Sequence, residues 1–191
     1  SCAEMLVAKR GYTRQDQDNY AIESYKRAKK AIDSGIFHKE IIPIETNKSN
    51  NDLVSISIDE EPYKFNYNKI TKLSPAFEKN GTITAANASK LNDGAAVLAI
   101  TSENKAYDLG LKPLAKILKQ VSVSHEPEWF TTAPGKAIEK ILNKANLSCS
   151  DIDLWEINEA FSAVAMAAID DYKIDHDKVN IYGGAVALGH P

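Results

Sequence analysis

The sequence predicts an α/β fold, in which helices cover sheets of buried strands, and three features indicate it. The continuous apolar run 95–100 suits a strand that is buried on both faces. Between residues 13 and 35, apolar side chains recur with the 3.6-residue period of an amphipathic helix. Segments 151–157 and 178–182 have the pattern of strands, and an alanine-rich helical segment separates them. Strands that alternate with helices are typical of this fold class.

Composition limits the class of protein. The 191 residues are 43% hydrophobic and carry a formal net charge of −3, with 23 basic and 26 acidic side chains. This length supports one sizeable core or two small ones, and the charge balance favours neither nucleic acid nor an anionic membrane as a partner. The most apolar segment, 160–169, is too short to span a bilayer. We therefore expect a soluble globular protein.

The cysteine content indicates a reducing compartment, because Cys2 and Cys149 are too few for a disulfide framework. Cys2 lies in a helix-start pattern and Cys149 in a loop before an acidic turn. We interpret both as structural thiols.

Two helices are predicted at the beginning of the chain. Ser1 and Glu4 have the spacing of a capping box, and Gly11 ends the helix that they start. A second helix runs from Thr13 to Gly35, with Arg27 and its neighbouring lysines solvated. Its inward-facing stripe is formed by Ala21, Tyr25, Ala28 and Ile32. From the periodicity alone, Tyr25 is a packing residue.

A hairpin follows these helices. Residues 40–45 resemble an edge strand, because Pro43 cannot donate to a central ladder, and 54–58 alternate as a half-buried strand. The polar residues 46–52 form the turn between them. From 60 to 77 the periodicity is lost.

Small residues dominate the next part of the chain. A short strand at 82–84 leads into the run 85–89, whose small side chains allow the backbone to approach a ligand, an ion or a neighbouring element. A helix over 102–109 follows the buried strand 95–100, and Gly110 ends it. Lys112 and Pro113 mark a linker, so we place a domain boundary between 1–110 and 111–191.

The second domain repeats the alternation of strands and helices. A strand is predicted over 114–123, a helix over 134–145 and a strand over 151–157. The last strand delivers Asn158 to the start of the alanine-rich helix. From spacing alone Asn158 is the helix N-cap, and the helix dipole favours Glu159 beside it.

The stretch 183–191, with the sequence GGAVALGHP, is the strongest chemical signal in the chain. Its three glycines permit close approach of the backbone, and Pro191 keeps His190 out of helical geometry. Because a strand is predicted over 178–182, we expect His190 on a loop beyond a strand's carboxyl end. A histidine there can take or give a proton near neutral pH.

Three motifs together resemble the thiolase family: the stretch 80–89 (NGTITAANAS), Asn158 to Phe161 (NEAF) and 183–191. The residues of these motifs are most similar to those of short-chain acetoacetyl-CoA thiolases, and the resemblance covers nearly the whole chain. It implies the layered αβαβα thiolase fold with a loop subdomain, incomplete at both ends. Residues 1–110 correspond to the later part of the N-terminal domain, with the CoA-covering loop subdomain at about 1–80. Residues 111–191 correspond to the first part of the C-terminal domain.

The sequence departs from the family pattern in its cysteines. Thiolases carry a nucleophilic cysteine in their first third and a second reactive cysteine shortly after the GHP motif, and neither is present in these 191 residues. The chain opens on Ser1 rather than Met, so we expect an internal piece of a longer enzyme that is inactive alone.

The resemblance implies a role for several residues. His190 and Asn158 are catalytic, with Asn158 holding a water that joins the histidine in an oxyanion hole. Coenzyme A is bound through Tyr25, Lys64, Phe65, Asn66, Lys69, Ser89 and Phe161, of which Phe161 borders the acyl pocket. A potassium ion is held by Tyr25, Ala85, Ala86, Ala88 and Val186.

The implied reaction is ping-pong acyl transfer between two acetyl-CoA and acetoacetyl-CoA plus CoA, without a covalent cofactor. The family further implies a homotetramer of the dimer-of-dimers type, a place in fatty acid and ketone body metabolism, and the mitochondrial matrix, with the cytoplasm as alternative. A ketoacyl synthase shares the fold but carries its histidines in other motifs. A non-catalytic thiolase-like protein that binds lipid or a partner is the remaining alternative.

Overall fold

The computed structural model describes residues 1–47 and 52–191. Its main helices are α1 (Cys2–Arg10), α2 (Arg14–Asp33), α5 (Ala133–Ala145) and α6 (Ser162–Tyr172), with the short helices α3 (Glu61–Lys64), α4 (Glu103–Asp108) and α7 (Ala185–Leu188). Short 3-10 helices lie at Ile36–Lys39, Ile70–Lys72, Pro127–Thr132, Cys149–Asp151 and His176–Lys178. Strands β1 (Ile44–Asn47) and β2 (Leu53–Ile56) complete the elements.

The predicted helices at the beginning of the chain are confirmed, with their caps. The Ser1 hydroxyl accepts from the amide of Glu4, and Gly11 ends α1 in the left-handed conformation (φ 69°). The Glu4 carboxylate does not complete the capping box, however, because it accepts from the amides of Thr82 and Ile83, each at 2.9 Å. Glu4 therefore joins α1 to the beginning of the small-residue run.

Helix α2 begins with a full capping box from Thr13 and presents the predicted apolar face. Ala21, Tyr25 and Ala28 are buried. The prediction that Arg27 is solvated is wrong, because its guanidinium donates to the carbonyl oxygens of His176 (2.9 Å) and Val179 (2.7 Å). Arg27 thus ties α2 to the chain that precedes the glycine pair.

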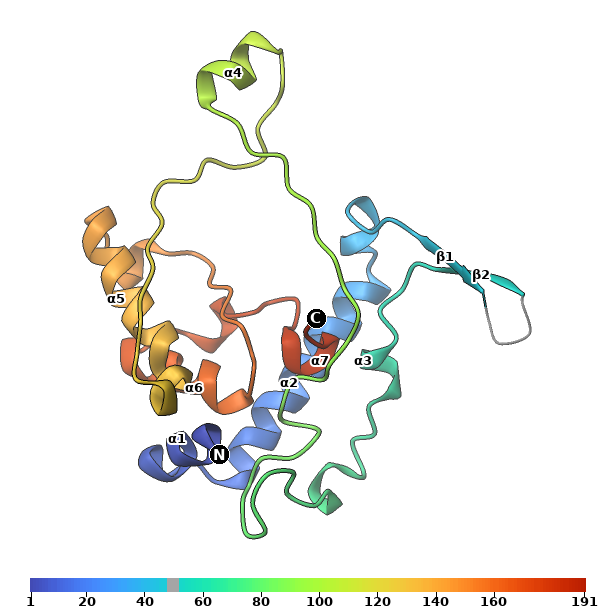
Figure 1. Cartoon of the computed structure of the whole chain (residues 1–191), viewed down its shortest axis with the longest axis vertical. Coiled ribbons are helices and arrows are strands. Elements are labelled where there is room, and N and C mark those ends of the chain that lie inside the picture. The colour runs from blue at the N-terminus through green and yellow to red at the C-terminus, as the bar shows by residue number, and fades with distance from the viewer. Residues whose placement is uncertain (48–51) are drawn as a thin grey trace.

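The hairpin is confirmed with shifted boundaries, but the prediction that 54–58 is half-buried is wrong, because Ile56 and Ile58 are exposed. Strands β1 and β2 pair antiparallel, with Ile44 opposite Ile56 and Asn47 opposite Leu53. Pro43 precedes β1 rather than lying within it, and part of the predicted turn 46–52 lies outside the described residues. The hairpin projects from the helices (Figure 1).

The other predicted strands are wrong for the described structure. Segments 82–84, 95–100 and 114–123 contain no regular strand, and 151–157 and 178–182 are linked by a single bridge from Trp155 to Val179. A strand requires a hydrogen-bonded neighbour, and the apolar runs 95–100 and 114–118 have none among the described residues. In Figure 1 the chain on either side of α4 extends away from the other helices, with α4 at the tip, and its returning part runs beside α5, where Lys140 and Lys144 donate to the carbonyl oxygens of Ser122 and Gln120. The helix predicted over 102–109 is confirmed as α4.

The core lies between the helices, in three clusters of buried apolar residues. The first joins α1 to α6, and the second joins α5 and α6 to the chain around Val179. The third joins α2 to α7 and contains Tyr25 and Val186. Helices α2, α6 and α7 therefore form the framework on which the three sequence motifs meet. Within the described residues, no helix combines the length and the apolar character needed to cross a membrane.

Candidate active site

Residues 87–92 bring the three sequence motifs together. At one end of this segment, the amide of Ser162 donates to the Asn87 carbonyl oxygen, and the amide and hydroxyl of Ser89 donate to the Ala160 carbonyl oxygen (3.0 and 3.2 Å). At the other end, the amide of His190 donates to the Lys90 carbonyl oxygen at 2.7 Å. Consecutive residues of one segment thus hold the chain that carries Asn158 and the chain that carries His190.

His190 follows the short helix α7, so the prediction that it lies directly beyond a strand is wrong. Gly189 ends α7 at φ 92°, a conformation that glycine adopts without strain. The imidazole is exposed, and its Nδ1 lies 2.7 Å from the Pro191 carbonyl oxygen, which can only accept. In the tautomer that donates from Nδ1 to this oxygen, Nε2 carries no proton and can act as a base.

Asn158 is not the N-cap of the alanine-rich helix, although its position between a predicted strand and that helix suggested it. Helix α6 begins four residues later, at Ser162, because the amide of Ser162 is bound by the Asn87 carbonyl oxygen and the chain stays extended through Phe161. Asn158 instead lines a cavity of about 330 Å³ together with Val123, Thr131, Pro134, Ala160 and Val164. Its side chain is exposed and remains available to a ligand.

The sequence reasoning missed the role of Glu159. Its carboxylate is fully buried and accepts four hydrogen bonds from groups on separate parts of the chain. The donors are the hydroxyls of Tyr20 (3.0 Å) and Ser24 (2.8 Å), the side-chain amide of Asn180 (2.8 Å) and the backbone amide of Val186 (3.1 Å). Burial of a charged residue type next to Asn158 is not visible in a sequence pattern, since a glutamate at a helix start is ordinarily solvated.

Tyr25 and Val186 lie in the same buried cluster between α2 and α7. The Tyr25 ring stacks on Phe65, with 3.8 Å between the ring centroids, and its hydroxyl has no hydrogen-bond partner among the described residues. Burial raises the pKa of Tyr25, so the phenol stays neutral at physiological pH. A buried hydroxyl without a partner is costly and indicates an absent ligand, ion or water.

Several carbonyl oxygens predicted to bind potassium lack a donor. Among the described residues, none donates to the carbonyl oxygens of Ala85, Ala86 or Ala88. The amide of His190, which would continue the helical bond to Val186, donates to Lys90 instead. The run 85–88 is held against α2 through Asn87, whose side-chain amide donates to Asp18 at 2.9 Å.

The remaining predicted CoA residues lie on two parts of the structure. Lys64 forms ion pairs with Glu60 (2.9 Å) and Glu61 (3.0 Å) at the end of α3. Asn66 accepts from the amide of Asn68, and Lys69 is exposed. Phe161 lies at the other part, edge-on to Phe77 at the start of α6.

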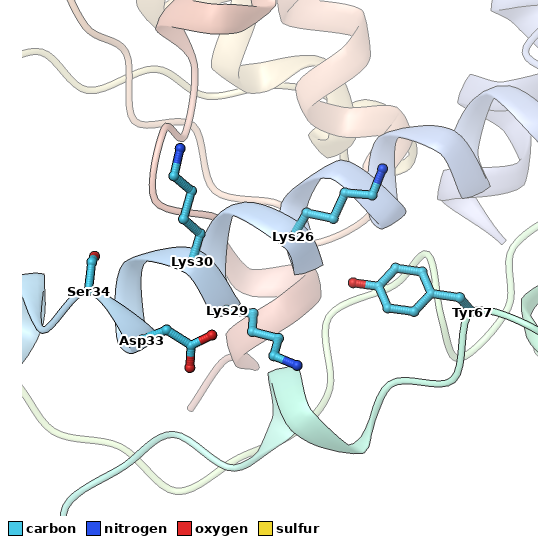
Figure 2. Close-up of a pocket in the computed structure, with 6 residues that line it drawn as sticks. All are labelled: Lys26, Lys29, Lys30, Asp33, Ser34 and Tyr67. Atoms are coloured by element: carbon cyan, nitrogen blue, oxygen red, sulfur yellow. The ribbon is translucent and has the colours of Figure 1, made fainter.

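A positively charged groove lies beside residues 64–69. Figure 2 shows Lys26, Lys29 and Lys30 of α2 around it, with the Tyr67 hydroxyl directed toward the helix. The groove has a volume of about 510 Å³. None of the three ammonium groups forms an ion pair with a described residue, although Lys29 lies over the Tyr63 ring. Their spacing along one helix is the signal that could have predicted it.

Neither cysteine is part of this arrangement. The Cys2 sulfur contacts the Pro127 carbonyl oxygen, and Cys149 packs against the cluster between α5 and α6. Among the described residues, no three His, Cys, Asp or Glu side chains are grouped so that they could hold a metal ion.

Comparison with known families decides the identity of the fold. The sequence-family model of the thiolase N-terminal domain matches residues 1–104, and that of the thiolase C-terminal domain matches residues 111–191. The chain belongs to the thiolase family. The resemblance that the three motifs suggested is thereby confirmed.

Thiolases named acetyl-CoA acetyltransferase are similar to the chain over its whole length. The enzyme of Yarrowia lipolytica is 49% identical over 100% of this chain and 48% of its own length. The mitochondrial enzyme of Mus musculus is 47% identical (100% and 45%), and the cytosolic enzyme of Gibberella zeae is 44% identical (99% and 48%). The chain thus spans about half the length of the relatives that it matches.

Solved thiolase structures confirm the predicted fold class. The acetyl-CoA acetyltransferase of Bacillus anthracis superposes with a TM-score of 0.95 at 43% identity, over 100% of this chain and 48% of its own. The Acat5 thiolase of Ascaris suum, solved in complex with coenzyme A, gives 0.89 at 42% identity, over the same shares of each chain. The backbone of the present structure is therefore that of the corresponding part of an α/β thiolase.

Proposed function

We propose that the protein is a short-chain thiolase that interconverts two acetyl-CoA with acetoacetyl-CoA and CoA by ping-pong acyl transfer. The observation that carries the proposal is the joining of three motifs by residues 87–92, which hold Ala160 through Ser89 and His190 through Lys90. The names of relatives that are 44 to 49% identical over the chain support the same activity.

His190 acts as the base and acid of the reaction. With its Nδ1 proton directed at the Pro191 carbonyl oxygen, Nε2 is free to take the proton of a thiol and return it to the leaving CoA thiolate. We assign the sulfur nucleophile to a residue outside these 191, because Cys2 and Cys149 contact other parts of the structure. That thiolate attacks the thioester carbonyl carbon, the bond to the CoA sulfur breaks, and an acyl-enzyme remains.

Asn158 supplies a donor for the negative charge that develops on the thioester oxygen. Its side-chain amide borders the 330 Å³ cavity, and we assign to it the water that joins His190 in the oxyanion hole. A donor directed at such a charge contributes about 3 to 4 kcal/mol to the stabilisation of the transition state. Phe161 and the small residues after it suit a pocket for a short acyl chain.

Coenzyme A is the substrate that we assign to the surface around Tyr25 and residues 64–69. The half-buried ring of Phe65 stacks on the buried Tyr25, and Ser89 lies where the segment 87–92 meets Ala160. Lys64 is already engaged by two carboxylates. We therefore assign the phosphates of the nucleotide end to Lys69 together with Lys26, Lys29 and Lys30 of the adjacent groove.

A potassium ion fits the oxygen atoms between α2 and α7. We assign the ion to the unpartnered hydroxyl of Tyr25 and the carbonyl oxygens of Ala85, Ala86, Ala88 and Val186, because oxygen atoms are the ligands that a hard monovalent cation prefers. When bound, the ion would supply positive charge and fix these backbone segments. The side chain of Tyr25 would hold it from the helix.

The assembly and the compartment complete the proposal. We assign a homotetramer, as the resemblance to the thiolase family implies. Light scattering of the full-length protein tests it. We assign the mitochondrial matrix, with the cytoplasm as alternative, since relatives in both compartments are similar to the chain. Fractionation of cells that express the full-length protein distinguishes the two.

Thiolysis of acetoacetyl-CoA tests the proposed activity. The full-length protein is incubated with acetoacetyl-CoA and CoA, and acetyl-CoA is quantified by chromatography. We expect two acetyl-CoA for each acetoacetyl-CoA consumed. Binding of acyl-CoA without turnover would contradict the proposal and favour the non-catalytic lipid-binding alternative.

A further inference from the structure

The buried carboxylate of Glu159 connects the parts of the chain that carry the two proposed catalytic residues. Its donors come from helix α2 (Tyr20 and Ser24), from the turn before the glycine pair (Asn180) and from the first turn of α7 (Val186). Asn158 is its neighbour in the chain, so the two Cα atoms are about 3.8 Å apart. One side chain therefore links the backbone of Asn158 to α7.

The geometry of the carboxylate shows that it acts as an acceptor only. Oε1 accepts from Tyr20 and Asn180, and Oε2 accepts from Ser24 and the Val186 amide. Each oxygen thus receives two donors, which is the arrangement that stabilises an ionised carboxylate in the interior. The nearby charge adds to burial in raising the pKa of Tyr20, whose phenol keeps its proton and continues to donate.

Gly184 is required by the same contact. Its amide donates to the Ser24 hydroxyl at 3.1 Å, and Ser24 in turn donates to Glu159. A Cβ atom at Gly184 would lie 2.5 Å from the carboxylate carbon, so no side chain fits there. Gly183 is equally confined, since its Cβ would lie 2.6 Å from the Cβ of Ala28. The glycine pair lets α7 approach both the carboxylate and α2.

The position of α7 determines the position of His190. The amide of Gly189 donates to the Ala185 carbonyl oxygen at 2.9 Å, so the helical bonding continues to the residue before the histidine. On its other side His190 is held by a backbone bond to Lys90. A shift of the first turn of α7 would therefore be transmitted along one helical turn to the imidazole.

We propose that Glu159 is a positioning residue that fixes α7, and thereby His190, relative to Asn158 for acyl transfer. This inference rests on the proposed function. Glu159 contacts neither substrate nor reacting atoms; it sets the distance between the base and the oxyanion donor. Misplacement of a catalytic group by about 1 Å lowers rates by up to about 100-fold.

Glu159→Gln in the full-length protein tests the proposal with almost no change of shape. An amide nitrogen at either oxygen position would face one N–H donor, whose hydrogen bond is lost, and one hydroxyl, which would have to reverse its role and accept. We expect kcat for thiolysis to fall about 10- to 100-fold, while KM for acetoacetyl-CoA changes less than about threefold. An unchanged kcat would overturn the proposal.

If Glu159→Gln does not fold, a pair of tyrosine variants tests the positioning role of Glu159 instead. Tyr20→Phe removes one donor to Glu159, whereas Tyr172→Phe removes a bond of similar length, 2.8 Å to the Gly135 carbonyl oxygen, between α6 and α5. We expect a decrease in kcat of about three- to tenfold for Tyr20→Phe and less than about twofold for Tyr172→Phe. Equal effects of the two variants would contradict a specific role.

Hydrogen exchange separates this proposal from the proposed activity. The amides of Gly184 and Val186 donate into the network, so we expect them to exchange about tenfold faster in Tyr20→Phe than in Tyr172→Phe. Unchanged exchange rates at Gly184 and Val186 would contradict the proposed role of Glu159, whether or not the protein is active. An unmodified protein that does not cleave acetoacetyl-CoA would overturn the proposed function, while the exchange rates still decide whether Glu159 holds α7.

Discussion

The helices around Glu159 and the segment 91–125 are both rich in apolar residues, but their environments differ. In the helical region, Tyr25, Val186 and the alanines of α6 are buried, and even the carboxylate of Glu159 has four donors. In the segment, Leu91 is 96% exposed and Val97 94% exposed. An apolar pattern therefore predicts that a segment needs burial, but it does not identify the residues that cover the segment.

The two regions also differ in how their backbone bonds are satisfied. Residues 87–92 bond to Ala160 on one side and to His190 on the other, so the site is held by contacts within the chain. Residues 95–100, a few positions later, have no strand neighbour among the described residues. We therefore expect the helical region to retain its form alone and the segment to require cover.

Among the proposed variants, substitution of His190 is expected to have the largest effect on activity. In the full-length protein we expect His190→Ala to lower kcat in both directions by about 1,000-fold or more, because it removes the base, the acid and one oxyanion donor together. Steady-state kinetics measure the loss. Full activity would contradict the assignment of His190.

Substitution of Asn158 tests whether its role differs from that of His190. Asn158→Ala removes only a positioned donor, so we expect kcat to fall about 100-fold with little change in the affinity for CoA. Kinetics and calorimetric binding of CoA give the two quantities. A larger effect on CoA affinity than on kcat would show that Asn158 binds substrate rather than the oxyanion.

Replacement of sodium by potassium tests the oxygen set between α2 and α7. We expect the activity of the full-length enzyme to rise several-fold in potassium, and Tyr25→Phe to remove most of this response, because the hydroxyl is the one side-chain ligand. Phe65→Leu, which alters the stacking partner of Tyr25 but not the ligand set, is the control. Equal rates in both salts would argue against the ion.

The lysine groove beside Tyr67 has the smallest expected effect among the variants. Lys29→Ala removes one exposed charge, so we expect KM for CoA to rise about two- to fivefold with kcat unchanged, and the effect to shrink at high salt. Dephospho-CoA, which lacks the 3′-phosphate, is the matched probe. If Lys29→Ala raised KM equally for CoA and for dephospho-CoA, the groove would not bind the 3′-phosphate.

Local patterns predicted the helices well, because their signals lie within a few residues. The caps at Ser1 and Thr13 and the left-handed glycine at position 11 follow from short-range hydrogen bonds and sterics. The strands at 95–100 and 114–123 could not be predicted correctly from pattern alone, since a strand also depends on a neighbour. The pairing of β1 with β2 was predicted correctly because the two strands are adjacent in the chain.

The candidate site also combines features that local sequence predicts with features that depend on distant residues. The motifs around Asn158 and His190 were visible in the sequence because residue types such as glycine and histidine carry their chemistry locally. The contact of Glu159 with Tyr20 and Ser24 joins residues more than 130 positions apart, and no spacing rule reports it. The N-cap interpretation of Asn158 was wrong because the backbone of Asn87 competes for the start of α6.

Assay of the 191 residues alone tests whether this chain carries the histidine and asparagine of a thiolase site but not its nucleophile. We expect no thiolysis of acetoacetyl-CoA, and association in light scattering because residues 91–125 expose apolar side chains. Supplying the flanking segments of the protein should restore activity. A monomeric 191-residue chain that melts cooperatively and cleaves acetoacetyl-CoA above background would contradict the account.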